Sequence, residues 1–166
     1  MHARRLIAVG CLGAALVAAG CGDGRSDEAQ TPVACLEGSA TYVRALDNAP
    51  GKVLVGGETP LSDCLAENQS GGELSTVGEA LIAAATELNA EAREDPGGQA
   101  TLELGYLIGA AKRGAEETEG IHTDLIRRLI VAARFAPGEE PLSPAFLATY
   151  EEGFDAGRAG GWLVDS

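Results

Sequence analysis

Apolar residues recur at helical spacing along most of this chain. The clearest stripe occupies six positions from Val77 to Ala92, at i, i+4, i+7, i+8, i+11 and i+15, which places all six on one helix face. Thr76 and Glu79 match the capping box that begins a helix, and the run Asp-Pro-Gly-Gly at 95–98 is typical of a helix end. This segment therefore predicts a long amphipathic helix with one buried side.

Other segments carry helical signals of their own. Thr31 followed by Pro32 is a cap with a proline in the first turn, and it predicts a helix that ends before Asn48. Thr59 followed by Pro60 repeats this signal and predicts the start of a short helix. The remaining predicted helices cover residues 100–117, residues 121–134 and a last segment that begins at Ser143-Pro144 and ends at the glycines of 157–161.

The segment 100–117 is apolar around its circumference, which predicts the central and most buried helix. Residues 52–55 form an apolar extended run that is too short and too isolated to build a sheet. The predicted fold class is therefore all-α, a compact bundle of about five to six helices with one disulfide and no significant sheet.

A glycine repeat adds a candidate site to this picture. The pattern Glu-x-Gly-aromatic-x-x-Gly occurs at 103–109 and again at 151–157. Glycine inside a helix costs about 1 kcal/mol relative to alanine, so two glycines in each helix suggest a use for the missing side chains. Glycines four apart leave a flat stripe that another backbone can approach closely. The candidate binding or packing residues are Gly105, Tyr106, Gly109, Gly153, Phe154 and Gly157.

Two interpretations of this repeat are open. The stripes could form the floor of a groove for a ligand or a partner peptide, or the two helices could pack on each other through their glycines. Of the two, we favour packing. Seven residues do not decide whether the repeat is a duplication or reflects helix packing alone.

The beginning of the chain is typical of an export signal. Arg4 and Arg5 precede an apolar run from Leu6 to Ala19, about 21 Å long as a helix and too short for a bilayer core of about 30 Å. The run leads into Leu-Val-Ala-Ala-Gly-Cys at 16–21. This hexapeptide resembles the lipobox of bacterial lipoproteins.

The resemblance covers residues 1 to about 22 and implies that Cys21 carries lipid and begins the mature chain. It divides the chain into a signal peptide at 1–20, a flexible lipidated tether at 21–31 and a single helical domain at 32–166. Ala18 stands where leucine is commoner, so cleavage by the ordinary signal peptidase nearby is the alternative. The implied location is outside the cytoplasm, anchored to the membrane by lipid on Cys21 and facing the outside or the periplasm.

The cysteines fit an exported protein. Cys11 would leave with the signal and Cys21 would carry lipid, which leaves Cys35 and Cys64 for a disulfide in an oxidising compartment. No Cys-x-x-Cys spacing is present and a single histidine lies beyond the signal. We therefore expect no metal site.

The charge balance is strongly acidic. The formal net charge is −13, and removal of residues 1–20 takes away Arg4 and Arg5 and no acid, which makes it −15. Such a domain is not expected to bind nucleic acid, which requires clustered lysines and arginines. Anionic headgroups should also repel it, so the lipid and not the charge would bring the protein to the membrane.

No motif for catalysis or for a cofactor stands out, and we expect no cofactor. We expect His122 to be exposed at the start of a helix. The leading hypothesis is a non-enzymatic binding or interaction module of the cell envelope, with an envelope protein or a small ligand held near Gly105 and Gly153. The alternatives are a small-ligand carrier, an envelope hydrolase that uses His122 with nearby acids, and a structural spacer.

Overall fold

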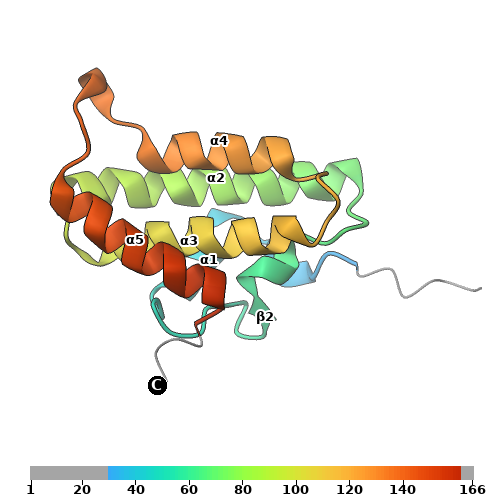
Figure 1. The fold of residues 1–166 in the computed structure, drawn as a ribbon. Coiled ribbons are helices and arrows are strands. Elements are labelled where there is room, and N and C mark those ends of the chain that lie inside the picture. The colour runs from blue at the N-terminus through green and yellow to red at the C-terminus, as the bar shows by residue number, and fades with distance from the viewer. Residues whose placement is uncertain (1–29, 162–166) are drawn as a thin grey trace, which may run out of the picture.

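The longest element is helix α2 (Gly71–Glu94), and three of the other α-helices pack against it (Figure 1). The computed structural model describes residues 30–161, so the predicted signal, Cys21 and nearly all of the tether lie outside the described part. None of the helices in this part is long and apolar enough to cross a membrane. In chain order the elements are η1 (Val33–Leu36), α1 (Ser39–Leu46), β1 (Leu54–Val55), β2 (Thr59–Pro60), η2 (Leu61–Cys64), α2 (Gly71–Glu94), α3 (Gln99–Glu116), α4 (Thr123–Arg134), η3 (Pro137–Glu139) and α5 (Pro144–Ala159).

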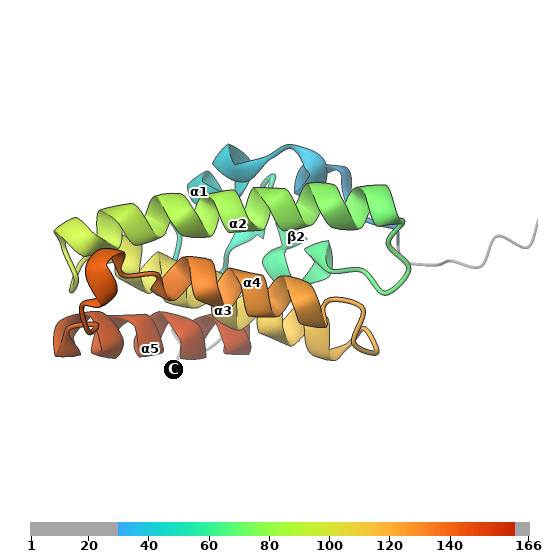
Figure 2. The same cartoon turned by 90° about the horizontal axis from the view of Figure 1, so that it is seen from above.

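Helices α2 to α5 alternate in direction, so α3 and α5 run the same way. Helix α4 lies along α2 and α5 lies along α3, while α1 packs on the other side of α2 (Figures 1 and 2). The predicted all-α bundle is confirmed, since the described residues form five α-helices and one sheet of two short strands.

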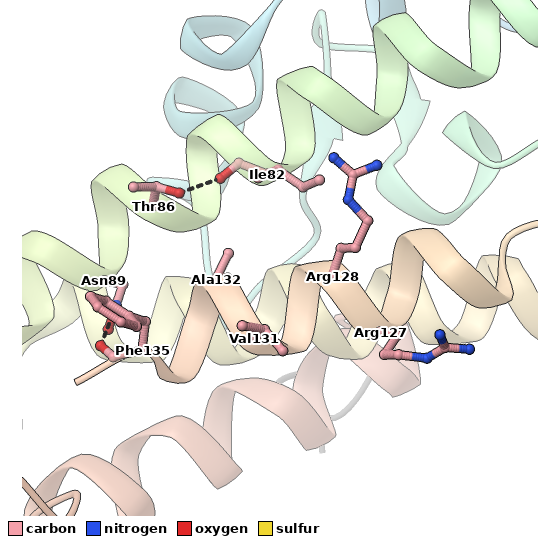
Figure 3. Close-up of a pocket in the computed structure, with 8 residues that line it drawn as sticks. All are labelled: Ile82, Thr86, Asn89, Arg127, Arg128, Val131, Ala132 and Phe135. Carbon is pink, nitrogen blue, oxygen red and sulfur yellow. Dashed lines mark hydrogen bonds between the residues drawn. The ribbon is translucent and has the colours of Figure 1, made fainter. Parts of the chain in front are cut away.

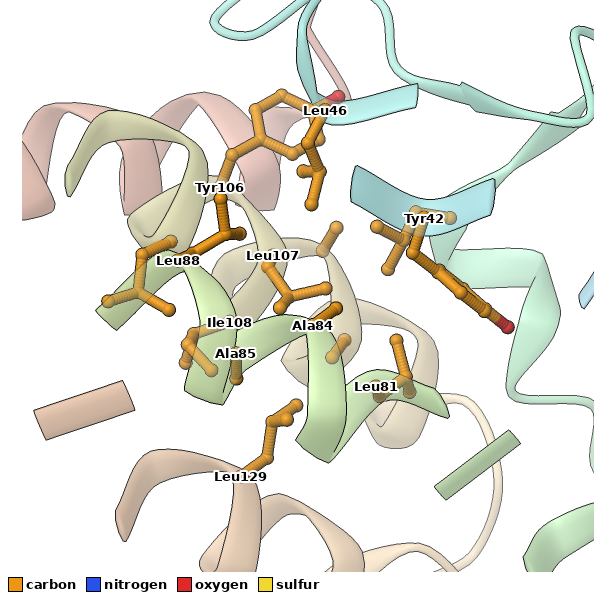
Figure 4. Close-up of a cluster of buried hydrophobic side chains, with 14 of the residues drawn as sticks. Tyr42, Leu46, Leu81, Ala84, Ala85, Leu88, Tyr106, Leu107, Ile108 and Leu129 are labelled. Carbon is orange, nitrogen blue, oxygen red and sulfur yellow. The ribbon is translucent and has the colours of Figure 1, made fainter. Parts of the chain in front are cut away.

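The core lies where α2, α3, α4 and α1 meet (Figure 4). The stripe predicted between Val77 and Ala92 is buried, and α3 is buried over eleven consecutive residues, 101–111. Helix α3 is the central helix, as predicted, because α2, α4, α5 and η2 all contact it. The side chains at the centre include Tyr42, Leu46, Leu81, Ala84, Ala85, Leu88, Leu107, Ile108 and Leu129.

The start of α2 differs from the prediction. Ser70 is the cap: its hydroxyl accepts a hydrogen bond from the Glu73 N–H, and the Glu73 carboxylate accepts one from the Ser70 N–H. The capping box predicted at Thr76 and Glu79 was wrong, because the Thr76 hydroxyl instead donates to a backbone carbonyl within the helix. Both pairs have the same sequence signature, and the two glycines at 71–72 are tolerated in the exposed first turn.

The segment before α2 is less helical than predicted. The first predicted helix is split into η1 and α1 at Gly38, whose φ of 94° is left-handed and interrupts a helix. The helix predicted to open at Thr59-Pro60 begins two residues later, as the 3-10 turn η2, because Thr59 pairs with Val55 in a two-residue antiparallel ladder.

The predicted disulfide joins Cys35 of η1 to Cys64 of η2 and is confirmed. Their Cα atoms lie 5.5 Å apart, and neither side chain is exposed. The caps predicted for the last helix are confirmed too: Ser143 accepts a hydrogen bond from the Phe146 N–H, and Gly160 ends α5 in the left-handed conformation.

Candidate functional site

The glycine repeat lies between the parallel helices α3 and α5. A Cβ atom on Gly105 would overlap the carbonyl oxygen of Tyr150, and one on Gly153 would overlap that of Leu102. Gly109 and Gly157 meet the carbonyl oxygens of Phe154 and Tyr106 in the same way. The two stripes therefore face each other with backbone against backbone, and the space above each is filled by the other helix.

The aromatic residues of the repeat have different surroundings. Tyr106 is 2 % exposed, and its hydroxyl oxygen accepts a hydrogen bond from the Val53 N–H at 3.4 Å. Phe154 is half-buried, with its ring 6.4 Å from the Tyr150 ring and 5.3 Å from Nζ of Lys112. Tyr106 thus connects the α3–α5 pair to the loop before β1. Phe154 instead packs between Tyr150 of α5 and Lys112 of α3.

His122 is fully buried at the start of α4, so the expectation of an exposed histidine was wrong. Its Nδ1 lies 2.7 Å from the Thr118 hydroxyl, and its Nε2 lies 2.7 Å from the Gln69 side-chain oxygen. Gln69 in turn donates to Thr31 Oγ1 at 3.0 Å and to the Cys64 carbonyl at 2.9 Å. The ring therefore joins the α3–α4 turn, the loop before α2 and the first residues of the domain.

The partners of Gln69 decide the tautomer of this ring. The Cys64 carbonyl can only accept, so it orients the Gln69 amide with its NH2 toward Cys64 and its oxygen toward His122. Nε2 then carries the proton, and Nδ1 is an acceptor that shares the single proton of the Thr118 hydroxyl with the Ala115 carbonyl, 2.9 Å from that hydroxyl. Burial also lowers the pKa of His122, which favours the neutral ring.

An open and mainly apolar groove lies between α2 and α4 (Figure 3). Its volume is about 400 Å³. Helix α4 buries Leu125, Leu129 and Ala133 against the core, but on the groove side the short Ala132 and Thr86 leave space unfilled. The lining residues are Ile82, Thr86, Asn89, Arg127, Arg128, Val131, Ala132 and Phe135.

The mouth of the groove exposes large apolar side chains to solvent. Val131 is 63 % exposed and Phe135 is 60 % exposed. An exposed aliphatic and an exposed aromatic side chain beside an apolar hollow are typical of a binding surface.

A buried amide lies at one end of the groove. Asn89 is 6 % exposed, and its Nδ2 donates to the Phe135 carbonyl at 2.8 Å. Its Oδ1 is buried and has no hydrogen-bond partner within residues 30–161. A buried acceptor without a partner costs about 1–3 kcal/mol, so a donor brought by an occupant would be stabilised there.

Two arginines lie at the other end (Figure 3). Arg127 forms an exposed ion pair with Asp124 at 3.3 Å, which contributes little because both groups face water. Arg128 forms no ion pair with any described residue, so its guanidinium is available to an anion.

This groove was not predicted from the sequence. The sequence does contain one feature that indicates an exposed apolar patch. Val131 and Phe135 are apolar residues four apart, and they lie outside the buried stripe of the helix, among its arginines. One apolar pair on a polar face is common on soluble helices, so only the neighbouring α2 shows that it borders a hollow.

Within the described ranges, no three or more His, Cys, Asp and Glu side chains gather closely enough to hold a metal ion. The search against protein-family models, curated proteins and solved structures found no match to this chain.

Proposed function

We propose that this chain is a lipid-anchored, non-enzymatic binding module of the bacterial cell envelope, and that it binds a small anionic amphiphile in the α2–α4 groove. The observation that carries the proposal is the pairing of an open apolar hollow with a buried, unpartnered acceptor, Asn89 Oδ1. The anchor follows from the lipobox resemblance at Cys21, which lies outside the described residues.

The apolar part of the ligand would lie between the two helices. Ile82 of α2 faces Val131 and Ala132 of α4 across the groove (Figure 3). Covering these side chains, together with the exposed ring of Phe135, removes apolar surface from water at about 25 cal/mol per Å². This term favours a hydrocarbon chain.

The polar part of the ligand would meet the arginines. Arg127 and Arg128 both line the groove, and a carboxylate or phosphate can accept hydrogen bonds from a guanidinium. A hydroxyl or amide N–H farther along the ligand would satisfy Asn89 Oδ1. These features favour an anionic amphiphile over a neutral or cationic one.

A hydrolase that uses His122 is the weaker alternative. The ring is fully buried, and its nitrogens contact Thr118 and Gln69, neither of which is an acid. A general base must reach the proton that it removes from the substrate. The bonds around His122 therefore favour a structural role.

The proposal is tested with the mature chain carrying Cys21→Ser, so that no attached lipid competes for the groove. Binding of dodecanoate, dodecanol and dodecyltrimethylammonium is measured by titration calorimetry below their micelle concentrations. We expect dodecanoate to bind best, and Arg127→Glu with Arg128→Glu to weaken it at least about tenfold, since hydrogen bonds to charged groups contribute about 1.5–3 kcal/mol.

Thr86→Trp is the variant that fills the groove, because Thr86 is exposed and lines it. Glu87→Trp is the matched control, since Glu87 is the next residue of α2, is also exposed and points about 100° away. We expect the first variant to abolish binding and the control to retain it. Equal binding of the three amphiphiles, or equal loss in both variants, would contradict the proposal.

A further inference from the structure

The outer face of α4 combines exposed apolar side chains with positive charge. Three of the four large apolar residues exposed in the described part lie on α4 or beside its ends: Ile121 (45 %), Val131 (63 %) and Phe135 (60 %). The α4 segment itself holds three arginines and one aspartate in a chain of net charge −13. The charge of this acidic protein is therefore distributed unevenly, and α4 is locally basic.

The tether leaves the domain close to the start of α4. Thr31, at the beginning of the domain, is bonded to Gln69, and Gln69 is bonded to His122 next to the first turn of α4. Nine residues separate Thr31 from Cys21, and ten Cα–Cα steps reach at most about 35 Å. Helix α4 is about 18 Å long, so a lipid on Cys21 would allow α4 to lie along the membrane.

From this geometry we infer that the outer face of α4 docks on an anionic membrane surface. The apolar side chains Val131 and Phe135 would enter the interface, and the exposed Arg127 and Arg128 would contact the headgroups. The rest of the acidic surface would face away, because anionic headgroups repel it. The lipid on Cys21 would hold the protein at the membrane, and the basic, apolar face of α4 would set its orientation there.

This orientation also gives the α2–α4 groove a source of ligand. Val131 and Phe135 belong both to the docking face and to the groove lining, so the mouth of the groove would open at the lipid surface. In this respect the inference rests on the proposed function. Docking itself needs no ligand and is measured separately.

The test uses the mature chain with Cys21→Ser, which leaves α4 as the candidate attachment. Cosedimentation is measured with phosphatidylglycerol vesicles and with phosphatidylcholine vesicles. We expect binding to the anionic vesicles alone and its loss as salt is raised. Arg127→Glu with Arg128→Glu should weaken binding at least about tenfold.

The charge control is Arg44→Glu with Lys52→Glu, which changes the net charge equally at two exposed residues that do not line the groove. Insertion is followed in the variant Phe135→Trp with Trp162→Phe, whose fluorescence should shift to the blue with anionic vesicles. The docking proposal would be overturned if the chain bound neither kind of vesicle, bound both equally, or lost as much vesicle binding in the charge control as in the Arg127/Arg128 variant. It would also be overturned if sedimentation showed a dimer that Phe135→Ser abolishes.

Membrane docking by α4 and ligand binding in the groove can be disproved independently of each other. Thr86→Trp fills the groove but keeps Arg127, Arg128 and the apolar character of the docking face, so it should still bind anionic vesicles. Vesicle binding by a chain that takes no dodecanoate would uphold docking and reject the ligand. Dodecanoate binding by a chain that ignores vesicles would do the reverse.

Discussion

The backbone carbonyl of Leu102 occupies the space into which a Cβ atom on Gly153 would project. Such an atom would overlap the carbonyl oxygen and stand 2.8 Å from the carbonyl carbon. Both obstructing atoms are backbone, so no side-chain rotation relieves the clash. Gly153→Ala should therefore separate α3 from α5 and lower the free energy of unfolding by about 3 kcal/mol or more.

Gly72→Ala is the control for this change. Gly72 is exposed in the first turn of α2, and a Cβ there would lie 4.0 Å from its nearest neighbour, Ser70 Oγ. Because alanine favours a helix, we expect a gain of up to about 1 kcal/mol. Urea denaturation of both variants measures the difference, and similar stabilities would argue against close α3–α5 packing.

Removal of the disulfide should weaken the whole domain. Cys35 and Cys64 are 29 residues apart, and a closed loop of that size contributes about 3–4 kcal/mol by restricting the unfolded chain. Cys35→Ala with Cys64→Ala should lose this amount in denaturant titrations. The parent chain in reductant should match the double variant; unchanged stability in reductant would contradict the prediction.

His122 should make stability fall in mild acid. Its folded pKa is lowered by burial, whereas the unfolded chain takes up a proton near pH 6.5. The contribution of the neutral ring is thus fully present above about pH 6.5 and is lost as the pH falls through the folded pKa. His122→Gln should remove this component when unfolding free energies are compared between pH 5 and 8. Parallel pH curves for the two chains would rule out the effect.

His122→Ala addresses the hydrogen-bond network itself. It would leave Gln69 Oε1 without its ring partner, at a cost of about 1–3 kcal/mol for a buried group left unsatisfied, whereas the Thr118 hydroxyl would keep its bond to the Ala115 carbonyl. The Gln69 amide also holds Thr31, so hydrogen exchange should rise at the start of the domain. If hydrogen exchange rises only in α4, the hydrogen bonds of His122 and Gln69 do not stabilise the start of the domain.

Glu103 should oppose stability at high pH. Its side chain is 6 % exposed on α3. Burial raises the pKa of Glu103 above the usual range, and the negative charges of Asp47 and Glu91 raise it further. A hydrogen bond with the Gln99 side chain lowers this pKa in part. A raised carboxyl pKa stabilises the fold at low pH, and this contribution is lost as the pH rises through the folded pKa. Glu103→Gln should therefore be more stable than the parent chain at pH 8 but not at pH 4.

The matched control is Glu151→Gln, because Glu151 occupies the same position of the glycine repeat and is exposed. It should leave the pH dependence of unfolding unchanged. If both variants gain equally at pH 8, the relief comes from the net charge of the protein and not from burial of Glu103.

Cys21→Ser tests the lipid anchor. We expect the parent chain to take up an alkynyl palmitate label and to fractionate with membranes, because several acyl chains bind a bilayer strongly. The variant should lose the label. Cys11→Ser is the control, since Cys11 lies within the predicted signal and should leave labelling intact. A label retained in the Cys21 variant would refute the anchor.

The sequence by itself determined the all-α class, the segments of the longer helices, the cap at Ser143 and the pairing of Cys35 with Cys64. These features depend on residues close together in the chain or on the small number of cysteines, so periodicity and local hydrogen bonding suffice. The capping box was misplaced because two Ser/Thr-x-x-Glu pairs occur six residues apart, and only the path of the chain decides between them.

Only the tertiary structure decided the burial of His122, the partner of each glycine stripe and the presence of the groove. His122 meets Gln69 across 53 residues, and Asn89 meets the Phe135 carbonyl across 46. Such contacts depend on how separate helices lie against one another. The hollow between α2 and α4 likewise depends on how two helix surfaces meet, because short side chains leave space only where their neighbours also fail to fill it.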